Sequence, residues 1–159
     1  MRAHRLEDFA DVAAMWLDPE VTRHISAGSQ SEEDVWARLL RYAGHWSLMG
    51  FGYWAVRERA TGRFVGDVGF ANLRRTITPS LGDAPEAGWV LAHWAHGQGF
   101  ATEAVTAALA WAATTFDRPT VCIIDPDNAA SIRVAEKCGY RFVTQASYRG
   151  EPVLSYERP

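Results

Sequence analysis

The chain has few of the residues that build disulfide frameworks or zinc sites. Its two cysteines, Cys122 and Cys138, are too few for the common four-ligand zinc site and give no pattern typical of secreted domains. Each lies in an apolar segment, which favours a buried thiol. A catalytic cysteine is disfavoured because no histidine lies in a matching motif. We therefore expect no metal site.

Long apolar runs and an excess of positive charge are also absent. No apolar run approaches the roughly 18 residues of a membrane span, and the polar residues at positions 1–7 indicate no signal peptide. Lysine occurs once, at Lys137, and the formal net charge is −3. A nucleic-acid-binding surface normally needs a basic patch, so we expect no nucleic-acid partner. These absences predict a cytoplasmic protein without membrane contact.

Apolar residues, by contrast, are plentiful. Of the 159 residues 48% are hydrophobic, and seven are tryptophans, which suffices for the core of one domain. No internal repeat, low-complexity tract or linker divides the sequence. We therefore expect a single domain over residues 1–159.

A glycine-rich turn between a predicted strand and a predicted helix is the most informative segment. The strand covers residues 85–91, and the turn reads His96-Gly97-Gln98-Gly99 before Phe100-Ala101-Thr102 open the helix. The first turn of a helix has unpaired N–H groups and the positive end of the peptide dipoles. Glycines lack Cβ atoms, so an anion can approach the main chain closely. Residues 96–102, which we call the phosphate loop, therefore predict a pyrophosphate site that needs no lysine.

The phosphate loop differs from two better-known glycine-rich motifs. No Gly-Lys-Ser/Thr follows, which excludes a Walker A sequence. The spacing Gly97-x-Gly99 followed by Ala101 differs from that of a dinucleotide-binding fingerprint. An isolated Gly-x-Gly is more often a tight turn that uses glycine only for its positive φ. A second motif changes this balance.

The second motif follows the apolar run of residues 121–124. It reads Asn128-Ala129-Ala130-Ser131 and continues to Glu136-Lys137-Cys138-Gly139-Tyr140. Together the two motifs resemble the GCN5-related N-acetyltransferase (GNAT) superfamily, and most of all its ribosomal-protein-alanine acetyltransferase branch. The resemblance implies that the phosphate loop binds acetyl-coenzyme A, with His96 where the family usually has Gln or Arg.

Apolar periodicity predicts early helices, then a meander of strands, then one strand–helix–strand crossover. This order indicates a mixed α/β sheet that is mostly antiparallel with one parallel step. The resemblance makes it a GNAT fold of the α+β type: a twisted sheet of six to seven strands, about four helices, and a splayed central parallel pair at the cofactor site. The predicted helices cover residues 8–17, 31 to the break at Gly50, 101–116 and 131–138; the predicted strands cover 53–57, 64–73, 85–91, 120–124, 140–147 and 151–157.

The start of the chain departs from the resembled branch, whose members usually begin with a full strand. Only residues 1–4 could supply it here. We expect a short or frayed edge strand, because the chain begins unusually late or its start codon is misassigned.

Acetyl transfer to an amine requires an uncharged amine, a stabilised oxyanion and a protonated leaving thiolate. The resemblance places the pantetheine arm along Trp89, Val90 and Leu91, and lets Asn128 cap its helix while contacting the cofactor. Many family members have a tyrosine acid seven residues after this asparagine, where this chain has Ala135.

Two side chains are therefore the candidate catalytic groups. Ser131 carries the nearest hydroxyl that could protonate the thiolate; alternatively it only satisfies the first turn of its helix. Glu86 could accept the amine proton through water; alternatively it is an exposed glutamate on an alternating strand.

Several further residues keep two interpretations. His24 and His45 either belong to the expected acceptor lid or are surface residues. Arg74-Arg75 either bind an acidic acceptor or the 3′-phosphate of the cofactor, or form a solvated turn. For Asp67, the sequence pattern is compatible with either face of its predicted strand. The tryptophans of the acceptor half line a pocket or pack in the core; they are Trp16, Trp36, Trp46 and Trp54.

The sequence thus predicts an N-acetyltransferase that moves an acetyl group from acetyl-coenzyme A to a primary amine by direct transfer in a ternary complex. The acceptor is a protein N-terminus or a small amine, and a homodimer is expected because relatives are often dimeric. The alternative is a catalytically silent acyl-coenzyme A-binding module. Amine-dependent release of free thiol distinguishes the two.

Overall fold

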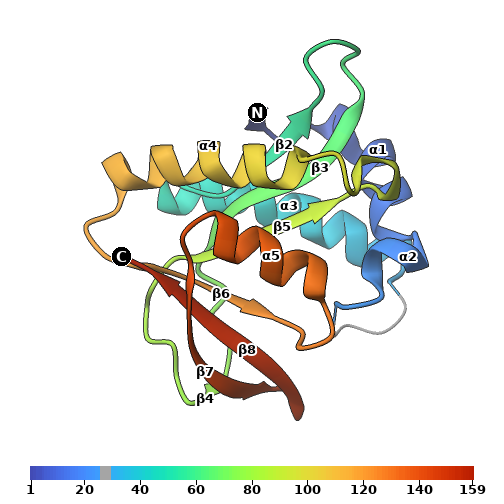
Figure 1. Cartoon of the computed structure of the whole chain (residues 1–159). Coiled ribbons are helices and arrows are strands. Elements are labelled where there is room, and N and C mark those ends of the chain that lie inside the picture. The colour runs from blue at the N-terminus through green and yellow to red at the C-terminus, as the bar shows by residue number, and fades with distance from the viewer. Residues whose placement is uncertain (26–29) are drawn as a thin grey trace.

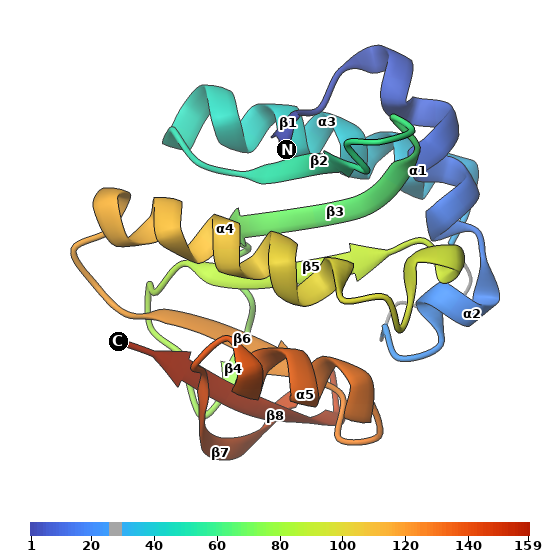
Figure 2. The same ribbon diagram turned by 45° about the horizontal axis from the view of Figure 1, so that its top comes forward.

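A single twisted sheet organises the molecule. The computed structural model describes residues 1–25 and 30–159, within which eight strands form one sheet in the order β1-β2-β3-β5-β6-β8-β7-β4. Helices cover both faces, α4 and α5 on one and α1 and α3 on the other (Figure 1, Figure 2). The strands are β1 (Arg2–Ala3), β2 (Tyr53–Arg57), β3 (Phe64–Ala71), β4 (Ile77–Thr78), β5 (Glu86–Leu91), β6 (Thr120–Ile124), β7 (Arg141–Tyr148) and β8 (Glu151–Arg158); the α-helices are α1 (Phe9–Trp16), α2 (Pro19–Thr22), α3 (Glu32–Met49), α4 (Phe100–Thr115) and α5 (Ala129–Lys137).

The middle of the sheet is its weakest point. β5 pairs with β3 at six positions, from Glu86↔Ala71 to Leu91↔Gly66. On its other side β5 runs parallel to β6, and only Glu86↔Val121 are register partners. The two strands diverge beyond this position, which confirms the predicted splayed parallel pair. All other neighbouring strands are antiparallel.

Local signals explain where the helices begin and end. The Ser31 side chain accepts a hydrogen bond from the Asp34 N–H, and the Asp34 carboxylate accepts one from the Ser31 N–H, which forms a capping box at the start of α3. α3 ends at Gly50, whose φ of 72° is left-handed. The predicted break at Gly50 is therefore confirmed.

The structure has more elements than the six to seven strands and about four helices predicted. β1, with two residues, is the short edge strand expected over residues 1–4, whereas the two residues of β4 are too few for a periodic pattern to reveal. Pro19 follows the predicted first helix and occupies the first turn of α2, where its fixed φ favours a helix and Asp18 accepts a hydrogen bond from the Glu20 N–H. The strand predicted over residues 64–73 ends at Ala71.

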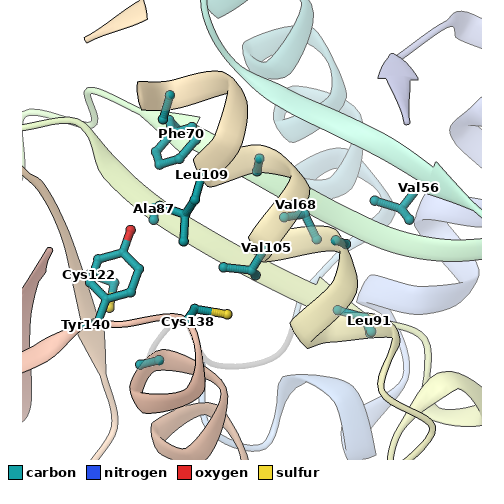
Figure 3. Packing of buried hydrophobic residues seen from close by; sticks show 14 of the residues in the cluster. Val56, Val68, Phe70, Ala87, Leu91, Val105, Leu109, Cys122, Cys138 and Tyr140 are labelled. Carbon is teal, nitrogen blue, oxygen red and sulfur yellow. The ribbon is translucent and has the colours of Figure 1, made fainter. Parts of the chain in front are cut away.

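Two apolar cores sandwich the sheet. On the face of α4, Val105 and Leu109 pack with Val68, Phe70 and other side chains of β3 and β5 (Figure 3). On the opposite face a smaller core joins α1, α3, β2 and β3. None of the helices in the described ranges is long and apolar enough to cross a bilayer.

The tryptophans of the first half serve mainly as core. Trp46 and Trp54 pack on each other and on Trp111, with ring centroids 5.0–5.8 Å apart. The Trp16 indole is buried and donates to the Asp67 carboxylate over 2.9 Å. Asp67 also lies 2.8 Å from His4 Nε2, so this fully buried carboxylate anchors α1 and the chain start to β3.

A second buried carboxylate, Asp8, fixes the start of α1. Its side chain has no exposed surface and receives hydrogen bonds from the Arg2 and Arg57 guanidinium groups over 2.7–2.8 Å. Burial raises the pKa of this carboxyl, but the bonds from Arg2, Arg57 and the Arg5 backbone outweigh it and hold the pKa well below its usual range.

The first prediction is that Asp8→Asn lowers the free energy of unfolding by about 2 kcal/mol at pH 7, less than for a fully buried pair because the arginines are partly exposed. Since the folded-state pKa is lowered, this contribution is complete above the unfolded-state pKa of about 4 and declines progressively as the pH falls below it toward the folded-state pKa. Urea unfolding of both proteins between pH 7 and pH 2.5 measures the difference.

The matched control is Asp11→Asn, because the exposed Asp11 carboxylate also binds Arg57 over 2.7 Å. We expect it to cost less than about 1 kcal/mol at any pH, as exposed pairs do. Equal losses of unfolding free energy in the two variants would contradict our inference that burial strengthens the Asp8 pairs.

Candidate functional site

A cavity of about 1070 Å³ opens where β5 and β6 diverge. One half is lined by the phosphate loop, by β5 and by the start of α5. The other half is lined by α3, by the end of α2 and by the connection from β3 to β4. The cavity therefore brings together the two sequence motifs and the expected acceptor side.

The phosphate loop leads into α4 as predicted. Gly97 and Gly99 have φ values of 73° and 86°, a left-handed conformation that disfavours other residues. Gly99 is the N-cap of α4, and no side chain caps this helix. The two interpretations of the glycines therefore coexist: they shape the turn, and the turn leaves the first N–H groups of α4 without a side-chain partner at the cavity wall.

The structure separates the predicted cofactor-binding residues of this loop into two groups. His96, Gly97, Gly99, Ala101 and Thr102 line the cavity. His96 Nε2 donates to the Leu91 carbonyl over 2.9 Å, which ties the loop back to the end of β5.

The other two loop residues do not line the cavity. The Gln98 amide donates to the Trp94 carbonyl over 2.6 Å, and the Phe100 ring packs edge-on against Trp94 with centroids 5.7 Å apart. Their side chains thus stabilise the loop, and any contact they make with a cofactor would come from the backbone.

β5 and α5 meet across the cavity through one side-chain contact. Trp89, Val90 and Leu91 line the wall formed by β5, and the Trp89 indole N–H donates to the Ser131 hydroxyl oxygen over 3.3 Å. The Asn128 side chain accepts a hydrogen bond from the Ser131 N–H over 3.0 Å and caps α5. Because the Ser131 oxygen accepts from Trp89, its own O–H remains available as a donor.

Glu86 lies at the last paired position before β5 and β6 diverge. Its two carboxylate oxygens lie 2.9 and 3.0 Å from Arg75 Nε, and its side chain is 12% exposed. Burial lowers the pKa of Arg75, but Glu86 and Tyr148 outweigh it and raise the pKa overall. Glu86 is therefore a carboxylate paired with a permanent cation, and Arg75 faces inward while Arg74 is exposed.

Sequence reasoning missed Tyr53, whose hydroxyl lies over the β5 backbone at Gly88. A Cβ placed on Gly88 would lie 1.9 Å from the Tyr53 hydroxyl oxygen, so the hydroxyl lies directly over the strand next to Trp89. Burial and the nearby Glu86 raise the pKa of Tyr53, which keeps the hydroxyl protonated. The glycine inside a strand signals a close approach of this kind, but the register that supplies Tyr53 cannot be derived from the sequence.

Both histidines of the expected lid line the cavity, but they are held by different partners. His24 lines the cavity, and its Nδ1 lies 3.1 Å from the Asp125 carboxylate, so it connects the end of α2 with the end of β6. His45 donates from Nδ1 to the Arg41 carbonyl over 2.9 Å within α3. Over the ranges 1–25 and 30–159, no cluster of His, Cys, Asp and Glu that could hold a metal ion is present.

Comparison with known proteins agrees with the geometry. A family model described as an acetyltransferase (GNAT) domain matches residues 1–141. Among solved structures, a Bordetella pertussis protein described as a GNAT-family acetyltransferase superposes with a TM-score of 0.83 at 28% identity, covering 99% of this chain and 93% of that one. Spermidine N-acetyltransferase from Vibrio cholerae, in complex with CoA and spermine, superposes with a TM-score of 0.75 at 15% identity, covering 99% and 92%. The second likeness shows the fold alone.

A curated relative is the Bacillus subtilis protein YkkB, which is 33% identical over 113 residues. The match covers 69% of this chain and 62% of YkkB, so it spans less than two thirds of that protein. These matches do not distinguish the ribosomal-protein-alanine branch, which stays a prediction.

The second prediction concerns the phosphate loop. Acetyl-coenzyme A should raise the melting temperature of the wild-type protein by several degrees, because a ligand of the folded state adds about 2.7 kcal/mol at 100 times its Kd. Gly99→Asp should abolish this shift, because the carboxylate repels phosphate at the helix N-terminus. Differential scanning fluorimetry measures both.

Gly62→Asp is the matched control, because Gly62 has a similar φ of 73° and equally open surroundings on the β2–β3 hairpin. It carries the same backbone strain away from the cavity and should keep the shift. A folded Gly99→Asp protein with the wild-type shift would remove the loop from the site.

Proposed function

Because the chain belongs to the GNAT acetyltransferase family, we propose that it transfers the acetyl group of acetyl-coenzyme A directly to a primary amine in a ternary complex. The observation that carries this proposal is the cavity in which the uncapped start of α4 meets the diverging edges of β5 and β6. A cofactor and an acceptor can reach the same stretch of β5 from opposite halves of this cavity.

The backbone supplies most of the proposed cofactor site. The free N–H groups at the start of α4 suit the pyrophosphate. Beyond Glu86, the edge of β5 has no β6 partner, so Trp89, Val90 and Leu91 can offer backbone groups to the pantetheine arm. Asn128 and Ser131 border the same space from α5. The bound cofactor supplies an activated thioester.

The reaction needs two proton movements. The amine nitrogen forms a bond to the acetyl carbonyl carbon while the carbon–sulfur bond breaks, the amine loses a proton, and the sulfur leaves as a thiolate that takes one up. We assign the first proton to Glu86 through a water molecule, because its paired carboxylate lies at the cavity beside β5. We assign the second to the Ser131 O–H, which the Trp89 indole leaves free to donate.

The Tyr53 hydroxyl is a further donor in our proposal. Its position over Gly88 suits the polarisation of a carbonyl held along β5, and its raised pKa keeps the proton in place at neutral pH. Ala135, which replaces the tyrosine acid of many relatives, is fully buried.

One observation favours the alternative of a silent acyl-coenzyme A-binding module: both carboxylate oxygens of Glu86 contact Arg75, which competes with a water molecule or an amine for them. Such a module would keep the binding of acetyl-coenzyme A but release no thiol when amines are added.

The third prediction is that free coenzyme A thiol is released only when a suitable primary amine is present, measured with a thiol reagent over a panel of amines. Direct transfer predicts intersecting initial-velocity lines and no acetylated protein by intact mass. Parallel lines with an acetylated intermediate would contradict direct transfer, and binding without amine-dependent thiol release would favour the silent module.

The fourth prediction tests the proton route. Glu86→Gln should lower kcat by about 10²–10⁴-fold and alter the acidic limb of the pH profile, as loss of a general base does. Ser131→Ala should lower kcat while the melting shift produced by acetyl-coenzyme A stays unchanged, because the phosphate loop binds through its backbone. Tyr53→Phe serves as the comparison that removes only a hydroxyl. Wild-type turnover in Glu86→Gln and Ser131→Ala across the pH range would remove both residues from the mechanism.

We also propose that two copies associate. Phe142 and Val143 on β7 are 57% and 55% exposed, which is a large apolar surface for neighbouring residues. Light scattering at micromolar concentrations measures the mass, and a monomer throughout would contradict the proposal.

A further inference from the structure

Three of the arginines that line the cavity lie on its acceptor side, on α3 and on the connection from β3 to β4. Arg38 and Arg41 lie on α3, and Arg75 lies on the connection from β3 to β4; all three line the cavity. Glu86 neutralises Arg75 through the ion pair described above. Arg23, which also lines the cavity, is paired with Glu20, whereas Arg38 and Arg41 are not neutralised in this way.

Neither arginine of α3 has a carboxylate partner within the described part of the chain. Arg38 donates to the Gln30 side-chain oxygen over 2.9 Å, and its guanidinium lies 3.5 Å from the centroid of the Trp16 ring. Its Nε is buried and meets no acceptor among residues 1–25 and 30–159. The Arg41 side chain lines the cavity and makes neither an ion pair nor a hydrogen bond with any residue of these two ranges.

The three cations repel one another. Arg41 is exposed at the cavity wall, where partial desolvation and, after that, the positive charges of Arg38 and Arg75 lower its pKa. An arginine remains charged despite such a shift, so the repulsion persists in the folded protein. An anion placed between the guanidinium groups would relieve it.

The carboxylates nearby are already engaged. Asp34 accepts hydrogen bonds from the backbone and hydroxyl of Ser31. Asp67 is buried beneath the cavity, where it accepts from Trp16 and contacts His4. With Glu86 held by Arg75, the protein itself supplies no described anion for Arg38 and Arg41.

We propose that the acceptor is a small primary amine that bears a carboxylate, an amino-acid-like zwitterion whose anion binds Arg41 with support from Arg38. With the carboxylate bound at α3, the amine end lies toward Glu86 and β5, where the acetyl group is transferred. A peptide chain has a neutral amide where the amino acid has its carboxylate, and a polyamine carries only positive charge; both leave the arginines uncompensated. This inference rests on the acetyltransferase activity proposed above.

The test compares three amines that differ at one group: an amino acid, its carboxamide and the corresponding amine without the carboxyl group. We expect kcat/KM for the amino acid to exceed both others by about 10- to 100-fold, as for a charge-assisted hydrogen bond. The preference should shrink in 0.5 M salt, because the arginines are partly solvated. Equal or better use of the carboxamide or the decarboxylated amine overturns the inference.

The matched variants are Arg41→Gln and Arg59→Gln. Arg59 is exposed on the β2–β3 hairpin and does not line the cavity. Arg41→Gln should raise KM for the amino acid at least tenfold, change kcat little, and leave KM for the decarboxylated amine unchanged; Arg59→Gln should change none of these. Arg41→Glu should reverse the preference toward amines without a carboxylate. An unchanged preference in both Arg41 variants overturns the inference.

Failure of this inference is distinguishable from failure of the proposed function. Without an acetyltransferase, none of the three amines releases thiol, although acetyl-coenzyme A still raises the melting temperature. With an acetyltransferase of another specificity, thiol is released but the carboxylate gives no advantage. Retention of the acetyl-coenzyme A melting shift in the Arg41 variants shows that they are folded and bind the cofactor.

Discussion

The divergence of two parallel strands is the constraint on which the rest of the structure depends. β5 and β6 share one register pair, Glu86↔Val121, and then separate. Any protein sheet interrupted in its middle leaves backbone groups without partners, and such groups are costly unless water or a ligand satisfies them. The cavity formed by the divergence is therefore also a row of donors and acceptors along β5.

In the function that we propose, the two halves of the cavity differ in how they bind. The cofactor half relies on backbone geometry: positive φ values at Gly97 and Gly99, and a helix start that no side chain caps. The acceptor half relies on side chains whose charges are set against each other, Glu86 with Arg75 on one side and Arg38 with Arg41 on the other. A backbone site tolerates sequence change, whereas a side-chain site can be altered by one substitution.

The sequence predicted local features well and distant contacts poorly. The phosphate loop and the cap formed by Asn128 depend on residues within a few positions of one another, so their patterns are legible. The pairing of Glu86 with Arg75 and the position of Tyr53 over Gly88 depend on loop paths and strand register, which no local pattern encodes. β4 and α2 were missed because two to four residues are too few to show a period.

The path between β3 and β5 has a mechanical consequence. The chain leaves one half of the sheet, pairs at β4 with β7 on the far edge, and returns to β5 (Figure 2). The pairing of β4 with β7 thus links one half of the sheet to the other. Ile77 is paired with Tyr148, whose ring lies 4.7 Å from the Arg75 guanidinium. A slip of β4 by one residue along β7 would move this segment by about 3.3 Å and carry Arg75 out of contact with Glu86. The charge at the centre of the cavity is therefore controlled by the register of a two-residue strand at the edge of the sheet.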